Sequence, residues 1–217
     1  MGPRGRGVCD YWGIDPREVD ILMGTFTKSF GSAGGYIGGS KDFIAMLRKI
    51  SHSQTYGGVM SAPVAEQVMS SMRIIMGEDG TTEGVRRIHQ LARNAKYFRQ
   101  KLQQLGFIVY GNDDSPVVPV AVYMPTKLAY CVREMRKAGV AIVAVGFPAT
   151  PLVEGRIRFC MSASHTKEML DHVSVLTMKI ISYFISCFSF CHLHDPTPAN
   201  IYQNFRLSRR FTKSVTI

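Results

Sequence analysis

One lysine of this chain stands among hydroxyl and glycine residues just after a short apolar run. The run is Ile21–Met23, and Lys28 follows it, with Thr25 on one side and a glycine-rich stretch over residues 31–35 on the other. A lysine at the end of a buried strand is partly desolvated, which disfavours the ammonium form and leaves a nucleophilic amine. Such an amine forms a Schiff base with an aldehyde cofactor. Thr25, Thr27 and Ser29 are short hydroxyl donors that could bind a phosphate.

Three other interpretations of this lysine compete. Residue statistics alone favour an exposed surface lysine in a turn. A P-loop requires glycine directly before the lysine and again five residues earlier, where this chain has Thr27 and Leu22. A dinucleotide fingerprint requires G-x-G-x-x-G before a helix, whereas residues 31–34 read Gly-Ser-Ala-Gly and precede a predicted strand. The two nucleotide-binding motifs are therefore excluded, and the surface lysine stays open.

Longer motifs around the lysine resemble a known enzyme family. Residues 24–31 read Gly-Thr-Phe-Thr-Lys-Ser-Phe-Gly, and with Gly-Gly-Tyr-Ile-Gly at 34–38 they resemble the cofactor-lysine segment of the α-oxoamine synthases. These pyridoxal-phosphate enzymes condense an amino acid with an acyl-CoA. Further motifs, in the same order, resemble the lysine-bearing subunit (2 or 3) of serine palmitoyltransferase, at residues 51–53, 110–112, 143–151 and 156–166. The resemblance extends from about Gly2 to about Val175.

The resemblance implies an α/β fold, that of the fold-type-I transferases that depend on pyridoxal 5'-phosphate. Residues 1–80 would be the C-terminal part of the large cofactor-binding domain, and residues 81–176 a small C-terminal α/β domain. Residues 177–217 would form a tail that does not match the family. The tail includes an apolar run, Ile180–Phe190, that is too short for a membrane span. We expect the tail to be unrelated sequence, with a weak membrane-surface segment as the alternative.

The resemblance also assigns roles to individual residues. Lys28 would hold pyridoxal phosphate and act as acid and base on the substrate Cα, while Thr25 would bind the cofactor phosphate. Arg158 corresponds to the second arginine of an Arg-x-Arg motif that clamps the amino-acid carboxylate, a task suited to a planar guanidinium. Strand alternation points Arg158 away from Ile157 and Phe159, although an ion-paired surface arginine would give the same pattern. The loop 146–151 would be an active-site lid.

The implied reaction is the condensation of L-serine with palmitoyl-CoA to 3-ketodihydrosphingosine, a step of sphingolipid biosynthesis. The family pairs this subunit with long-chain-base subunit 1 at the cytosolic face of the endoplasmic reticulum membrane. Two features lower the activity expected of this chain. The acid that pairs with the cofactor's pyridine nitrogen has no match, and residues 57–59 read Gly-Gly-Val where the family has hydroxyls for the partner's cofactor phosphate. The alternatives are an inactive chain that still binds the partner subunit, and an α-oxoamine synthase that uses glycine.

The composition excludes several other classes. The net charge is +10, but no basic stripe with interleaved aromatic residues suggests nucleic-acid binding. The five cysteines form neither a disulfide framework nor a zinc pattern. Cys187 and Cys191 lie beside two histidines as half of a metal site, but no second ligand pair exists, so we expect no metal.

Apolar periodicity and glycine or proline punctuation predict the elements that position these residues. Strands are expected at 21–23, 36–37, 107–110, 117–123, 140–145 and 156–161. Helices are expected at 41–49, 63–76, 82–105, 128–137 and from Thr166 to about Leu176, with a polar loop at 51–61. The sheet of the small domain should be mainly antiparallel. The Met-rich face of the helix from residue 63 is expected to lie in the core.

Overall fold

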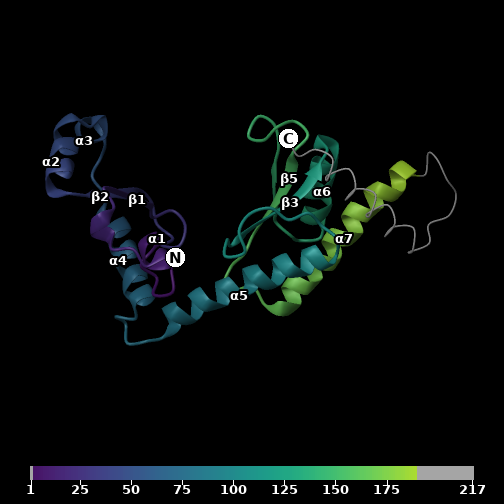
Figure 1. Cartoon of the computed structure of the whole chain (residues 1–217), viewed down its shortest axis with the longest axis horizontal. Helices are drawn as coiled ribbons and strands as arrows, with labels where there is room; N and C mark the ends of the chain where they lie inside the picture. Colours follow the sequence, from purple (N-terminus) through teal and green to yellow (C-terminus); the bar gives the residue numbers. More distant parts are fainter. Residues whose placement is uncertain (1, 190–217) are drawn as a thin grey trace. The chain divides into compact units, whose positions relative to one another are not determined.

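A computed structural model describes the backbone of residues 2–189 and the side-chain surroundings of residues 2–182. The chain divides into two compact units, Met1–His89 and the part that begins at Gln90, so the boundary lies within one long helix, α5 (Glu83–Gln104). Figure 1 shows the elements of each unit along the sequence.

The first unit is built around an antiparallel hairpin of β1 (Ile21–Thr25) and β2 (Gly35–Gly39). Glycines allow the two strands and their side chains to approach closely. A Cβ added at Gly24 would lie 2.3 Å from Cε1 of Tyr36, and one added at Gly35 would lie 2.5 Å from the carbonyl oxygen of Gly24. Gly35 therefore requires glycine, whereas a side chain at Gly24 would displace the Tyr36 ring, which lies over the strand there.

Short helices surround this hairpin in the sequence. They are α1 (Val8–Trp12), the 3-10 turn η1 (Pro16–Glu18), α2 (Lys41–Ile50), α3 (His52–Tyr56) and α4 (Ala62–Met76). The hydroxyl of Ser40 accepts a hydrogen bond from the Phe43 amide at 3.3 Å and caps α2. Helix α4 ends at Gly77, whose φ of 76° is the left-handed conformation that favours glycine.

The second unit contains most of α5 and a three-stranded antiparallel sheet in the order β3-β5-β4. Its elements are β3 (Val117–Tyr123), α6 (Pro125–Lys137), β4 (Val143–Val145), β5 (Gly155–Cys160) and α7 (Lys167–Ser189). Alternate residues of β3 and β5 are buried, and they form one core with apolar side chains of α5, α6 and α7. The residues between them lie on the opposite face, so the helices cover one face of the sheet.

Most of the predicted elements are confirmed, including the two strands on either side of Lys28, the antiparallel sheet of the second unit and the predicted helices. Four predictions were wrong. Residues 107–110 make only one bridge, Val109 to Val120, and the loop at 51–61 contains α3. The run 140–145 forms a strand only at β4, an edge strand whose Val143 is 48% exposed. The Met-rich face of α4 is exposed, at 44%, 40% and 46% for Met69, Met72 and Met76.

Helix α7 continues through Leu176 to Ser189, beyond the expected limit of the family resemblance. The domain boundaries at 80 and 176 stay predictions. The half metal site at Cys187 and Cys191 lies outside the described side chains. Within the described residues, no helix is long and apolar enough to cross a membrane. That part of the chain also contains no group of three or more His, Cys, Asp or Glu side chains able to hold a metal ion.

Candidate functional site

The candidate cofactor lysine lies in the turn that joins β1 to β2. Within this turn the Phe26 amide donates to the Gly34 carbonyl at 2.9 Å, and the Ser32 amide donates to the Phe26 carbonyl at 2.9 Å. The Gly31 amide donates to the carbonyl of Lys28 itself at 3.0 Å. The backbone of the lysine turn is thus fixed by its own hydrogen bonds. The side chain of Lys28 is exposed, so the expected partial desolvation is not seen.

Helix α4 holds this turn from the next segment of the first unit. Ser71 Oγ donates to the carbonyl of Phe30 at 2.9 Å, and Gln67 Nε2 donates to the same carbonyl at 3.2 Å. Ser32 Oγ donates to the Val64 carbonyl at 3.1 Å. Gln67 and Ser71 are four residues apart on one face of α4, which is why both side chains reach a single carbonyl. The turn is therefore anchored at two points, Phe30 and Ser32.

The hydroxyl of Thr25 lies within the same hairpin as the lysine. Its Oγ1 is 2.8 Å from Thr27 Oγ1 and 3.3 Å from the Gly34 carbonyl, and it also accepts from the Thr27 amide at 3.3 Å. Both threonines are exposed, so the hydroxyl pair is available to a ligand. Lys28 and Thr25 thus lie in the same hairpin, and their roles in cofactor binding stay predictions.

A cavity of about 590 Å³ opens beside this hairpin, between β1, β2, α2 and α3. Thr25 lines it, together with Tyr36 and the exposed Arg48 of α2. The Arg48 guanidinium has no hydrogen bond or ion pair with any described residue. Ser51 Oγ and Ser53 Oγ, 2.7 Å apart, add a second hydroxyl pair to the wall. The cavity lining therefore combines apolar side chains with the Arg48 guanidinium and several hydroxyls, a combination that suits an anionic ligand.

The other candidate residue, Arg158, lies on β5 of the second unit. Its neighbours Ile157 and Phe159 are 0% and 3% exposed, whereas the Arg158 side chain is exposed. It stands opposite Pro119 of β3 and Val143 of β4 in the register of the sheet. Among the described residues its guanidinium has no ion-pair or hydrogen-bond partner. The predicted orientation is confirmed, and the role in carboxylate binding stays a prediction.

Sequence reasoning missed a buried amide that supports the strand of Arg158. Asn94 of α5 is 5% exposed, and its Nδ2 donates to the carbonyls of Ser162 and His165 at 2.9 and 2.8 Å. The Ser162 amide in turn donates to His165 Nδ1 at 3.2 Å. These bonds fix the turn between β5 and α7. A signal was present, because Asn94 follows Leu91 by three residues on the predicted apolar face of this helix.

A second missed residue is a buried arginine. Arg99 is 1% exposed, and it donates from Nη1 to the Tyr110 carbonyl at 2.6 Å and from Nη2 to the Val117 carbonyl at 3.2 Å. Its Nε has no hydrogen-bond partner among the described residues, although Asp113 Oδ1 lies 3.8 Å away. Arg99 therefore ties the loop before β3 to α5, and the exposed Asp113 balances part of its charge.

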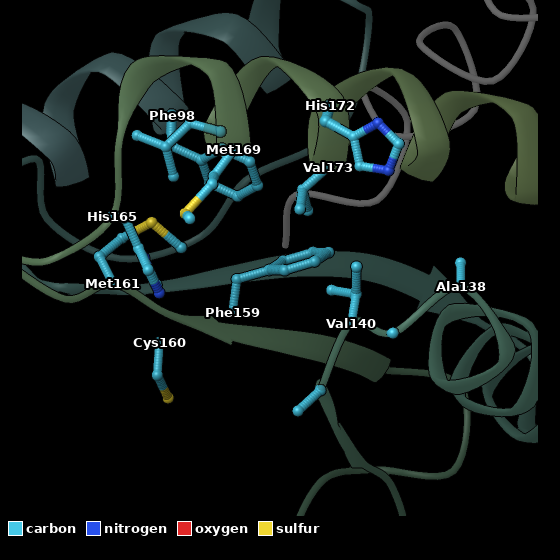
Figure 2. Close-up of a pocket in the computed structure, with 13 residues that line it drawn as sticks. Phe98, Ala138, Val140, Phe159, Cys160, Met161, His165, Met169, His172 and Val173 are labelled. Carbon is cyan, nitrogen blue, oxygen red and sulfur yellow. The ribbon is translucent and has the colours of Figure 1, made fainter.

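A further cavity of about 560 Å³ lies in the second unit, between the end of β5 and the start of α7 (Figure 2). Phe159 faces the helix that carries Met169 and Val173, whereas Cys160 points to the other side of the strand. The lining is mainly apolar and includes His165 and His172.

A core thiol of the second unit, Cys131, does not line this cavity. Burial raises the pKa of Cys131 to about 11, so this thiol stays protonated and unreactive near neutral pH.

Comparison with known proteins now adds to this geometry. Residues 6–174 match the family "Aminotransferase class I and II". Over 173 residues the chain is 58% identical to serine palmitoyltransferase 3 of Homo sapiens and to serine palmitoyltransferase 2 of Caenorhabditis elegans. Over the same length it is 51% identical to serine palmitoyltransferase 2 of Saccharomyces cerevisiae. Each alignment covers 80% of this chain but 31% of the relative, so the chain spans about a third of the length of these curated relatives.

Solved structures agree with the fold. Serine palmitoyltransferase of Sphingomonas wittichii superposes with a TM-score of 0.73 at 23% identity, over 83% of this chain and 44% of the bacterial one. The 8-amino-7-oxononanoate synthase of Francisella tularensis gives a TM-score of 0.72 at 13% identity, over 85% and 52% of the two chains. The predicted fold class and the resemblance to subunits 2 and 3 are thereby confirmed. The chain belongs to the aminotransferase class I and II family.

Proposed function

We propose that this chain is part of a subunit that uses pyridoxal 5'-phosphate to condense L-serine with palmitoyl-CoA, giving 3-ketodihydrosphingosine. The observation that carries the proposal is the lysine turn, in which Lys28 and the Thr25 hydroxyl share one hairpin. That hairpin lies within the region matched to relatives that bear the name serine palmitoyltransferase. Sphingolipid synthesis is the pathway that this reaction would serve.

The residues of the turn fit the cofactor. The exposed amine of Lys28 is accessible to an aldehyde, and the exposed Thr25 hydroxyl is a donor for a phosphate. The backbone between them is fixed by the Phe26–Gly34 and Gly31–Lys28 hydrogen bonds, which reduces the entropy lost when a ligand is ordered there. When bound, pyridoxal phosphate supplies an electron sink for a carbanion at the substrate Cα.

The chain's own residues would then share the work. The Lys28 amine would hold the cofactor and move a proton at the substrate Cα. The Thr25 hydroxyl would fix the phosphate. Arg158, whose guanidinium is exposed and has no carboxylate partner among the described residues, would bind the serine carboxylate with two parallel hydrogen bonds. All three groups are exposed, so each is accessible to the ligand that its role requires.

The proposal extends to a partner and a location. We infer pairing with long-chain-base subunit 1 as a heterodimer, at the cytosolic face of the endoplasmic reticulum membrane. The exposed methionines of α4 (Met69, Met72 and Met76) support a protein partner, because adaptable apolar side chains are enriched at such contacts. The location is inferred from the family alone.

One observation favours a second candidate, an inactive chain that binds the partner. Val59 is 96% exposed and follows Gly57 and Gly58, so residues 57–59 carry no hydroxyl where the family would bind the partner's cofactor phosphate. The backbone amides of these three residues could still bind a phosphate as a nest.

An assay with the partner subunit separates the candidates. The chain would be co-purified with long-chain-base subunit 1, then supplied with pyridoxal phosphate, palmitoyl-CoA and labelled serine. We expect labelled 3-ketodihydrosphingosine from wild type and from the control Lys41→Ala, an exposed lysine of α2, and none from Lys28→Ala. Co-purification without product would favour the inactive chain, and product from glycine instead of serine would favour a different α-oxoamine synthase. Equal product from Lys28→Ala and wild type would contradict the proposal.

A further inference from the structure

The face of the second unit's sheet that the helices do not cover carries two arginines. Arg156 and Arg158 are two residues apart on β5, so both side chains project from the same face, about 6.8 Å apart along the strand. Arg158 stands opposite Pro119 of β3. Arg156 stands opposite the small Ala121 of β3 and Val145 of β4, at the end of the strand nearer the loop 146–154. The function proposed above uses only Arg158.

The Arg156 guanidinium is held in place by an aromatic ring. Its Cζ lies 5.7 Å from the centroid of the Tyr110 ring, on the segment that bridges to β3. Cation–π contact of this kind orients the guanidinium without occupying its N–H donors. Arg156 forms no ion pair with a carboxylate among residues 2–182. Its donors are therefore oriented and available, as in a prepared anion site.

Strained backbone lies at the same corner of the sheet. Tyr123 has φ of 68°, rare for a residue other than glycine, and it follows a register shift between Ala121 and Tyr123. Bulges of this type redirect a side chain near functional sites. Burial and then a hydrogen bond to Tyr110 raise the pKa of Tyr123 to about 12, so its phenol stays neutral, and the charge of Glu154 acts in the same direction. The phenol of Tyr123 thus bonds to the tyrosine whose ring contacts Arg156.

Exposed apolar side chains border this corner. The loop 146–154 begins directly after Val145 and ends directly before β5, where Arg156 is the second residue. Within it Phe147, Leu152 and Val153 are 71%, 63% and 71% exposed. An oriented cation next to exposed apolar groups is complementary to an amphiphile that has an anionic head and a hydrocarbon chain.

We propose that Arg156 is an anion-binding residue separate from Arg158, and that it binds a phosphate of the long-chain acyl-CoA while the alkyl chain contacts the loop 146–154. The planar guanidinium suits a phosphate because two N–H donors can pair with two oxygens. The inference rests on the proposed function, because it assigns one half of that substrate pair. It leaves the serine carboxylate to Arg158.

Binding without the cofactor tests the assignment. The 217-residue chain would be titrated with palmitoyl-CoA below its micelle concentration and followed by calorimetry. We expect Arg156→Gln to weaken binding at least about tenfold, because a charge-assisted pair is lost. Arg133→Gln, which removes the same charge from an exposed position of α6, should change affinity by less than about twofold. Tyr110→Leu, which removes the ring under the guanidinium, should also weaken binding.

The source of the phosphate needs its own comparison. Inorganic pyrophosphate provides the phosphate without the chain, and phosphatidic acid vesicles provide a lipid headgroup. We expect pyrophosphate to bind more weakly than palmitoyl-CoA and to lose that binding in Arg156→Gln, whereas vesicle binding should depend on Arg156 less than palmitoyl-CoA binding does. Vesicle binding that is lost in Arg156→Gln, with palmitoyl-CoA binding unchanged, would overturn the assignment to the acyl donor.

Some results would overturn the Arg156 subsite and leave the proposed function standing, and others would overturn the function and leave the subsite standing. Palmitoyl-CoA affinity that is unchanged in both Arg156→Gln and Tyr110→Leu, or absent in wild type, would remove the subsite. Circular dichroism would check that the variants fold. If Arg156→Gln does not fold, the affinity of Tyr110→Leu for palmitoyl-CoA provides the test. Lys28→Ala should bind palmitoyl-CoA like wild type. Loss of the cofactor role of Lys28 with Arg156-dependent binding intact would therefore disprove the function and not the subsite.

Discussion

The two units of this chain differ in how they bury their apolar residues. The second unit has a continuous core in which side chains of α5, the sheet, α6 and α7 contact one another. In the first unit only Cys9 and Val68 are buried among the described apolar side chains, while Met23 and Ile37 of the hairpin are 77% and 54% exposed. Local stability follows buried contact. The candidate cofactor residues Lys28 and Thr25 therefore lie in the first, less stabilised unit, and Arg158 lies in the second, more stabilised unit.

Core truncation should show the largest difference. Phe98 of α5 is 0% exposed, and its ring packs edge-to-face on that of Phe159, with the two ring centroids 5.2 Å apart. Phe98→Ala should therefore lower the free energy of unfolding by about 3–5 kcal/mol. Met23→Ala in the first unit removes a side chain that is already in solvent and should cost less than about 0.5 kcal/mol. Urea unfolding followed by circular dichroism would measure both. Similar losses for the two variants would break the comparison.

The buried amide of the second unit gives the next largest effect. Asn94→Ala removes three hydrogen bonds, one accepted from Gln90 Nε2 and two donated, and leaves the carbonyls of Ser162 and His165 without this donor, at a cost of about 1–3 kcal/mol. Gln103→Ala, at an exposed position of the same helix, is the matched control and should be near neutral. Thermal unfolding would compare the two, and a neutral Asn94→Ala would show that the turn before α7 needs no such support.

The lysine turn should respond more weakly and more locally. Ser71→Ala removes the 2.9 Å bond to the Phe30 carbonyl, but Gln67 still donates to that carbonyl, so we expect a loss of about 0.5–1.5 kcal/mol. Hydrogen exchange should quicken at the amides of residues 26–34 and stay unchanged in the second unit. Ser70→Ala, exposed on the same helix, is the control. Uniform quickening across both units would mean that they are not independent.

The smallest effect is electrostatic. Hydrogen bonds from Arg86 and then Arg87 lower the pKa of Glu83 to about 2, from 4.5. Because the pKa is lower in the folded state, the stabilisation is present above about pH 4.5 and is lost as the pH falls towards about 2. Glu83→Gln should therefore lessen the decline in helicity across this window. Glu78→Gln should not, because Glu78 is exposed and has no ion pair with any residue that the structure describes. Salt should reduce the difference, since the pair is accessible to solvent.

Patterns within single elements were predictable from the sequence. Alternation on β5 predicted that Arg158 and the buried Ile157 would face opposite sides, because a strand has a period of two. The apolar residues on either side of Lys28 predicted the two strands β1 and β2, and apolar spacing predicted the helix α5. These features depend on neighbours in sequence, which periodicity reports directly.

Features that depend on distant contacts were missed. Val143 looked like core but lies on an edge strand, and sequence does not show which strand has a neighbour on only one side. Lys28 was expected to be desolvated, yet its turn extends past the strand into solvent. The contact between Arg156 and Tyr110 joins residues 46 positions apart, which no local pattern encodes.

The central claim is that Lys28 holds pyridoxal phosphate, and covalent mapping tests it most directly. The chain would be mixed with the cofactor, reduced with borohydride, digested and analysed by mass spectrometry. We predict one modified lysine, Lys28, in wild type and in the exposed control Lys41→Ala, and no modified peptide in Lys28→Ala. Label spread over surface lysines, with no preference for Lys28, would contradict the claim.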